Sequence, residues 1–147
     1  MRSIQKTTVF LVWLWLLPCI GCQTKKSCVI TIPNDFEGGI VVVQDATASV
    51  LEHTGTGYVL DIPTNGVFRT KTNPFRGLVD IVVKRSDGTP LIVTLNPYDD
   101  FRDQVGFRVC TSEGGDAVND HQQFYVGTAI DLEAFDFDSH FANDIRR

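Results

Sequence analysis

Short runs of valine, isoleucine, threonine and aromatic residues recur along this chain, separated by glycine, proline and asparagine. β-branched and aromatic residues favour strands, and the residues between the runs are those that turns require. A spacing of roughly ten residues between runs is typical of a sandwich or a barrel. The pattern predicts strands over residues 29–32, 40–44, 49–52, 58–62, 67–70, 78–84, 90–95, 105–110 and 123–126.

We therefore predict an all-β domain over residues 28–128, a single antiparallel β-sandwich of the immunoglobulin-like or transthyretin-like kind. The clearest hairpin spans residues 80–95, because Asp87-Gly88 can supply the positive φ angles of a tight turn. Pro90 would then begin the returning strand, where its missing N–H costs least. From Ala129 onward apolar residues are interleaved with acids, which favours a short helix or an acidic tail over residues 129–147.

The first 21 residues differ in character from the rest of the chain. Arg2 and Lys6 precede an apolar run over residues 9–17 that ends at Pro18. A positive start followed by a short apolar run is typical of a signal peptide, whereas a membrane-spanning helix needs about 20 apolar residues. We expect residues 1–21 to be a signal peptide that is removed.

The end of this segment indicates which kind of signal it is. Ile20-Gly21-Cys22 resembles the end of the bacterial lipobox, in which a small residue precedes the acceptor cysteine, although Cys19 stands where leucine is commonest. Cys22 is the predicted lipidation site, carrying palmitate-like acyl chains, and residues 22–27 would form a tether. Two or more chains anchor a protein stably, whereas one chain binds only marginally. An ordinary secretory signal with coincidental cysteines is the alternative.

Charge and length limit the function of the mature chain. From Cys22 it has 126 residues, enough for one domain, and its 11 basic and 18 acidic residues give a formal charge of −7. An acidic chain argues against nucleic acid as a partner and against binding to anionic lipid headgroups. The membrane partner would therefore be reached through the anchor. Gln23, which is not an aspartate, favours the outer membrane where a cell has one.

Two thiols remain once Cys19 is removed and Cys22 is acylated. Outside the cytosol, an even pair such as Cys28 and Cys110 is most simply a disulfide. The alternative is two buried, reduced cysteines. No cysteine and histidine spacing indicates zinc, and no cofactor is predicted.

Two groups of polar residues are candidates for chemistry. Asp99, Asp100 and Asp103 lie in one loop over residues 96–103, where carboxylates could bind calcium or act as acid and base together with His121. A solvated loop is the simpler interpretation.

The second group, Asp136, Asp138 and His140, would share a face only in an extended segment, and a charged surface is its simpler interpretation. The chain has no G-x-S-x-G elbow, no G-x-G-x-x-G and no P-loop, so we do not expect an enzyme.

Three segments carry a resemblance to a known family. They are residues 32–41 (IPNDFEGGIV), residues 57–67 (GYVLDIPTNGV) and residues 124–128 (FYVGT). Over residues 29–128 the chain resembles an uncharacterised family of bacterial lipoprotein domains with two such IP turns, which implies a β fold and an envelope address but no activity. Each IP turn also has an architectural account, since proline ends a strand and glycine permits a sharp turn.

The sequence predicts a lipid-anchored β domain of the cell envelope with a structural, ligand-binding or protein-binding role. The first alternative is an envelope hydrolase that uses the loop carboxylates with His121. The second is a subunit of an envelope assembly, in which a sheet edge pairs with a strand of an envelope protein partner.

Overall fold

The computed structural model describes residues 26–55, 57–75, 79–98, 101–110 and 121–145, so the predicted signal peptide and Cys22 lie outside it. Its strands are β1 (Lys26–Ile32), β2 (Gly38–Gln44), β3 (His53–Thr54), β4 (Gly57–Asp61), β5 (Val67–Thr70), β6 (Val79–Arg85), β7 (Val93–Thr94), β8 (Gly106–Cys110) and β9 (His121–Gly127). Its helices are α1 (Ala129–Glu133), α2 (Phe137–His140) and α3 (Ala142–Ile145).

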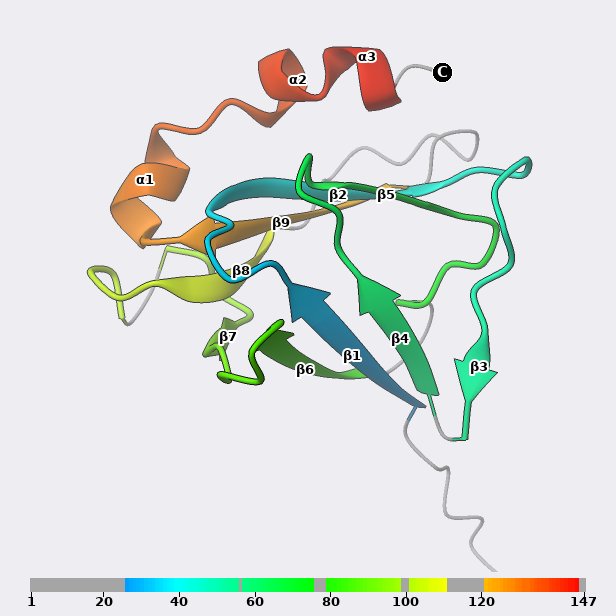
Figure 1. Cartoon of the computed structure of the whole chain (residues 1–147). Coiled ribbons are helices and arrows are strands. Elements are labelled where there is room, and N and C mark those ends of the chain that lie inside the picture. Colours follow the sequence, from blue (N-terminus) through cyan, green and yellow to red (C-terminus); the bar gives the residue numbers. More distant parts are fainter. Residues whose placement is uncertain (1–25, 56, 76–78, 99–100, 111–120, 146–147) are drawn as a thin grey trace, which may run out of the picture.

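The strands form two facing sheets, and the C-terminal helices lie beyond the second of them (Figure 1). Sheet A has the strand order β3-β4-β1-β6, and sheet B has the order β5-β2-β9-β8-β7. Strands of both sheets send every second side chain into a shared core, as expected of pleated strands with one buried face. The buried members of this core are Cys28, Ile30, Ile32, Ile40, Val42, Leu60, Ile62, Val83, Phe107, Phe124 and Val126.

The chain is mostly β with two facing sheets, as predicted, but the predicted purely antiparallel pairing is wrong because both sheets are mixed. In sheet A, β1 pairs in parallel with β4 and with β6, and in sheet B, β2 with β5 and β7 with β8 are parallel pairs. The reason lies in the connections. After β1 and again after β4 the chain crosses to sheet B instead of turning back within sheet A, and β4 and β6 then run in the same direction as β1.

Both IP elements of the sequence are these crossing turns. The first follows β1, where Phe36 N donates to Pro33 O at 3.1 Å, and the second follows β4, where Gly66 N donates to Pro63 O at 2.9 Å. Proline suits the start of each turn because its fixed φ and missing N–H end the strand ladder.

The two crossing turns stack on each other. Ile62 N donates to Thr31 O at 2.9 Å on the side of sheet A, and Val41 N donates to Gly66 O at 2.9 Å on the side of sheet B. Gly66 has a φ of 72°, and a Cβ at this position would collide with Gly39 O. The second IP turn therefore needs its glycine both for its conformation and for the close approach of β2 at Gly39.

Two local predictions need correction. The predicted hairpin starts as expected, with Arg85 N donating to Thr89 O at 2.7 Å and Leu91 N to Val83 O at 3.0 Å, but the chain then leaves for sheet B, where β7 is only Val93–Thr94. The predicted strand over residues 49–52 is wrong, and the short β3 follows it instead. Val50 is 64% exposed, and although Leu51 packs against the core, residues 49–52 are not part of a strand.

The C-terminal segment forms short helices, as the sequence favoured, and these cover the outer face of sheet B (Figure 1). A second apolar cluster joins them to the sheet. It consists of Val41, Val43 and Phe141, with Val67, Phe135, Phe137 and Ile145 packed against them. Arg69 adds a polar link, because its Nη2 donates to Asp144 O at 2.9 Å and lies 3.2 Å from Asp144 Oδ1.

Gly39 makes room for this C-terminal cover. A Cβ at Gly39 would lie 2.5 Å from Phe135 Cε1 and 2.9 Å from Phe141 Cε2. We expect Gly39→Ala to lower the free energy of unfolding by about 1–3 kcal/mol, the usual cost of overpacking. Chemical denaturation measures it. Phe135→Leu serves as the relieving partner, since the two substitutions together should cost less than the sum of their separate effects. Strict additivity would contradict the packing described.

Candidate functional site

The described part of the acidic loop lies at one end of β9, and His121 lies at the other. Arg102 O accepts from Ala129 N at 2.9 Å, just beyond the last residue of β9, whereas His121 is its first residue. Seven strand residues separate these positions by about 20 Å. The exposed Asp103 is therefore not an acid-base partner of His121, whose Nε2 lies 3.3 Å from Gln123 Nε2. Asp99 and Asp100 lie outside the described residues.

The second acidic group is helical rather than extended. Asp136 caps α2, with its Oδ1 accepting from Ser139 N at 3.1 Å, and Asp138 lies in the first turn of that helix. The ring of His140 packs against Phe135 and Phe141, with centroid distances of 5.1 and 4.7 Å. The extended arrangement that would have brought the three side chains to one face is absent. Among the residues that the structure describes, no group of three His, Cys, Asp or Glu side chains could hold a metal ion.

The predicted disulfide between Cys28 and Cys110 is not formed, and both residues are free thiols. Cys28 lies in β1 and points into the core between the sheets. Cys110 lies in β8 of sheet B, where Val109 packs against that core, so the alternation of the strand turns Cys110 to the opposite face. The two thiols are therefore separated by sheet B. Burial raises the pKa of Cys28 to about 12 and that of Cys110 to about 11.

A buried arginine organises the loop between β7 and β8. The side chain of Arg108 is 0% exposed, and its guanidinium group donates to four backbone carbonyls. Nε donates to Gly127 O at 3.1 Å and Nη1 to Pro97 O at 3.0 Å. Nη2 donates to Phe101 O at 2.9 Å and to Gln104 O at 3.1 Å. The planar fork of arginine suits several fixed acceptors, so one side chain holds the loop at three points and joins it to β9.

Phe101 has an unusual conformation at the centre of this arrangement. Its φ of 68° lies in the left-handed region that aromatic residues rarely adopt, at a cost of about 1–3 kcal/mol. Its carbonyl accepts from both the Arg108 guanidinium and Gln104 N. These hydrogen bonds account for the retention of the strained conformation.

The loop is also joined to the C-terminal segment. Arg102 Nη2 lies 2.6 Å from Glu133 Oε1 of α1, and both side chains are about half exposed. Such surface ion pairs contribute about 0–1 kcal/mol, so this contact adds less than Arg108 does.

The loop presents large apolar side chains to solvent. Leu95 is 76% exposed, Tyr98 55%, Phe101 53% and Val105 40%. We call these four residues the apolar loop surface. Exposed apolar groups gathered in one place commonly mark an interaction site, whereas single ones need no explanation.

Neither Arg108 nor the apolar loop surface was predicted from the sequence. A charged residue inside the strand GFRVC and aromatic residues inside the polar loop NPYDDFRD were the available signals.

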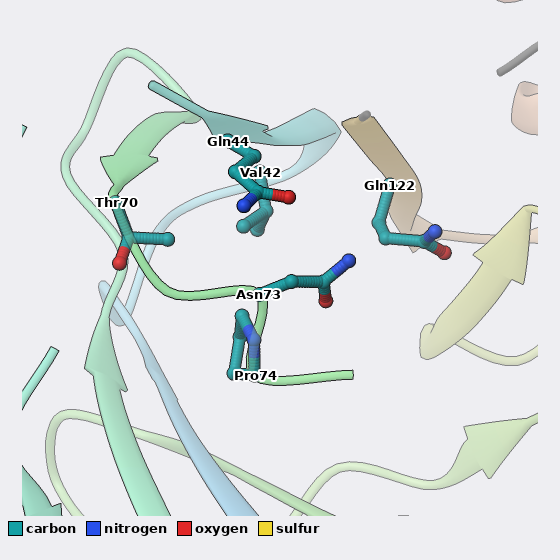
Figure 2. A pocket seen from close by; sticks show the side chains of 6 residues that line it. All are labelled: Val42, Gln44, Thr70, Asn73, Pro74 and Gln122. Carbon is teal, nitrogen blue, oxygen red and sulfur yellow. The ribbon is translucent and has the colours of Figure 1, made fainter. Parts of the chain in front are cut away.

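Two hollows in the described surface are poor ligand sites. Figure 2 shows the first, whose volume of about 10 Å³ holds no more than a water molecule. Its lining residues are Val42, Gln44, Thr70, Asn73, Pro74 and Gln122. The second is open, about 380 Å³ in volume, and lies over the first IP turn, lined by Pro33, Asn34, Asp35, Phe36, Glu37 and Thr64. Neither hollow collects a set of converging polar groups around an apolar cavity, as ligand pockets do.

Comparison with known proteins gives little further information. No protein-family model and no curated protein matches the sequence. Among solved structures, the chain is similar to a putative lipoprotein from Bacillus anthracis, with a TM-score of 0.46 and 16% identity over 69% of this chain and 71% of that one. In the described ranges, no helix is long and apolar enough to cross a membrane.

The state of the cysteines can be tested by thiol titration and by pH. We expect two reactive thiols per denatured, unreduced mature chain and slow reaction in the native state, because the thiolate is the nucleophile. A raised pKa in the folded state means that stability is lost as pH rises from the ordinary value of 9.0 towards 12, since the unfolded thiol ionises first. The melting temperature should fall over this range, and less so in Cys28→Ala. A titration that finds fewer than two thiols per chain would contradict this expectation and indicate that the disulfide forms.

Arg108 and Arg102 form a matched pair of variants in one segment. Arg108→Lys should lower the free energy of unfolding by about 2–4 kcal/mol, because lysine cannot reach four carbonyls and each buried acceptor left without a donor costs about 1–3 kcal/mol. The loop should also become sensitive to proteolysis. Arg102→Lys should cost less than about 1 kcal/mol. Denaturant unfolding and limited proteolysis measure both effects, and equal costs for the two variants would contradict the role assigned to Arg108.

Proposed function

We propose that this protein is a cell-envelope lipoprotein, anchored through acyl chains on Cys22, whose β domain binds a protein partner through the apolar loop surface. The anchor is supported by the sequence, namely the charged start, the short apolar run and the Gly21-Cys22 junction. The observation that carries the binding role is the exposure of Leu95, Tyr98 and Phe101 on a loop that Arg108 holds in place.

The described part of the loop is well suited to recognition because Arg108 holds the carbonyls of Pro97, Phe101 and Gln104 before any partner arrives. A loop that is already ordered loses little conformational entropy on binding, so more of the contact energy contributes to affinity. Aromatic side chains are enriched at the centres of protein interfaces, where tyrosine supplies both apolar area and a hydroxyl group. Loops supported by a rigid scaffold are common carriers of binding function.

Binding is favoured over catalysis as the role of this domain. The hydrolase alternative paired loop carboxylates with His121, and the described part of the loop lies at the far end of β9 from that residue. The apolar side chains on the loop suit a protein contact better than a hydrolytic site. A formal charge of −7 on the mature chain disfavours nucleic acid as the partner.

The proposed location is the cell envelope, where the acyl chains on Cys22 attach the domain to a bacterial membrane and the domain is either periplasmic or surface-exposed. Gln23 favours the outer membrane over the inner one where both exist. The proposed partner is another envelope protein, because an anchored domain meets the proteins of its own envelope.

Site-specific photocrosslinking in intact cells tests the proposal. A photoreactive phenylalanine at Tyr98 should give an adduct with a protein of defined mass, and the same probe at the exposed Ser49 should not. Phe101→Asn should reduce the adduct at least fivefold, because asparagine tolerates the left-handed conformation but lacks the ring. Cys22→Ala should abolish fatty-acid labelling, leave an unprocessed precursor and reduce the adduct.

The two halves of this proposal fail separately. Normal fatty-acid labelling of Cys22→Ala would refute the anchor. The binding surface would be refuted by an adduct that forms equally from Tyr98 and Ser49, or by one whose yield is unchanged in Phe101→Asn.

A further inference from the structure

The outer face of sheet A carries an aligned apolar row. The parallel register pairs Val29 of β1 with Val59 of β4 on one side and with Val82 of β6 on the other. Val59 is 41% exposed, Val82 is 53% exposed and Val29 is half-buried. Because paired residues in a sheet point to the same side, the three valines form one continuous strip across three strands.

The next row of the same face carries opposite charges at its two ends. Thr31 of β1 is paired with Asp61 of β4 and with Lys84 of β6. Asp61 and Lys84 are both exposed and lie two strand spacings apart, about 10 Å. The charges are thus placed symmetrically about β1, one on each side.

Parallel strands are normally covered on both faces of their sheet. The inner face of β4, β1 and β6 packs on sheet B, but no helix or strand in the described residues lies over their outer face (Figure 1). The C-terminal helices cover sheet B instead. The outer face of sheet A therefore combines exposed apolar side chains with parallel strands, as does a sheet face that another element covers.

We propose that a second copy of this chain covers the outer face of sheet A, related by a two-fold axis parallel to β1. This rotation exchanges the two sides of β1 and keeps the height along the strands. The valine rows then stack on each other, and Lys84 faces the partner's Asp61 while Asp61 faces the partner's Lys84. Stacked sheets lie about 10 Å apart, a gap that a lysine and an aspartate side chain together can span.

The position of the membrane anchor selects this axis, a step that rests on the proposed lipidation of Cys22. β1 begins at Lys26, so at most about 14 Å of extended chain separates it from the acylated residue. Two copies held in one membrane need both anchors at the same end of the dimer, and an axis along β1 provides this. An axis across the strands would place the anchors at opposite ends and would bring Lys84 against the partner's Asp80.

The size of the face predicts a weak association. Three strands of this length cover about 14 by 20 Å, well below the roughly 800 Å² per partner of a standard interface. Attachment of both copies to one membrane raises their effective concentration and offsets this limit. We therefore expect the dimer in membranes and at high protein concentration, and monomers in dilute detergent.

Thiol crosslinking of the full chain in isolated membranes tests the dimer. In a Cys110→Ser background, Thr31→Cys lies beside the proposed axis and should be joined to its equivalent by a bismaleimide of about 10 Å, giving a band of twice the chain mass. Ser139→Cys, on the exposed side of α2, is the control and should remain a monomer. The axis across the strands would separate the two Thr31 positions by well over 10 Å, so the reagent distinguishes the two arrangements.

Charge reversal supplies the decisive comparison. Lys84→Asp should reduce the crosslinked band at least fivefold, and Asp61→Lys combined with Lys84→Asp should restore it, which also shows that the variants fold. The proposal would be overturned by absence of the band, by an adduct with a different protein, or by a band whose intensity does not change in Lys84→Asp. Phe101→Asn should leave the band unchanged, so failure at the loop surface remains distinct from failure here.

Discussion

The crossing of the chain between the two sheets at its proline turns is the constraint on which the rest of the structure depends. Each crossing sends the next strand into the opposite sheet, so β1 and β4 become parallel neighbours in sheet A while β2 and β5 become parallel neighbours in sheet B. The stacked turns are held by Ile62 N to Thr31 O and Val41 N to Gly66 O. In this arrangement one face of each sheet is buried in the shared core. What the molecule can bind therefore depends on whether each of the two outer faces is covered.

The two outer faces differ in what covers them. Sheet B receives the C-terminal segment, whose Phe135 ring fits over Gly39 and whose Asp144 meets Arg69. Sheet A receives no described element, and its valine row stays in contact with water. A cover made by the chain itself is always present, whereas a cover made by a second copy depends on concentration. The same architecture can therefore hold one face closed and leave the other responsive to crowding in the membrane.

The sequence predicts the strands of this fold much better than their pairing. Predicted segments such as 67–70 match β5 because β-branched and aromatic composition reflects burial on a pleated surface. Pairing depends on where the chain goes after each strand, and Pro33 and Pro63 mark a stop without showing whether the chain turns back or crosses. The hairpin at Asp87-Gly88 shows the same limit, since its first hydrogen bonds form before the chain leaves for sheet B.

The candidate site was less predictable for a related reason. Cys28 and Cys110 both lie in strands, as expected, but the disulfide required them to face each other, and facing is a property of sheet assignment. The loop over residues 96–103 was correctly identified as polar in composition. Which of its side chains are exposed, however, depends on the direction in which each one points. Arg108 binds the carbonyls of Pro97 and Phe101, while the side chains of Tyr98 and Phe101 are exposed.

β1 links the proposed anchor to the outer face of sheet A, because it follows Cys22 in the chain and lies between β4 and β6. It is flanked on both sides by parallel partners, with register pairs running from Ser27 to Thr31 against β4 and from Lys26 to Ile32 against β6. A pull transmitted through a tether at Lys26 acts along this strand, so the hydrogen bonds to both neighbours are loaded together rather than broken one at a time. The side chains of Cys28, Ile30 and Ile32 add a buried apolar row to the same strand. With the proposed anchor on Cys22, a force from the membrane would be resisted within sheet A. The apolar loop surface lies between β7 and β8 of sheet B and is joined to β9 by Arg108, so it belongs to a different sheet from the strand that follows the proposed anchor.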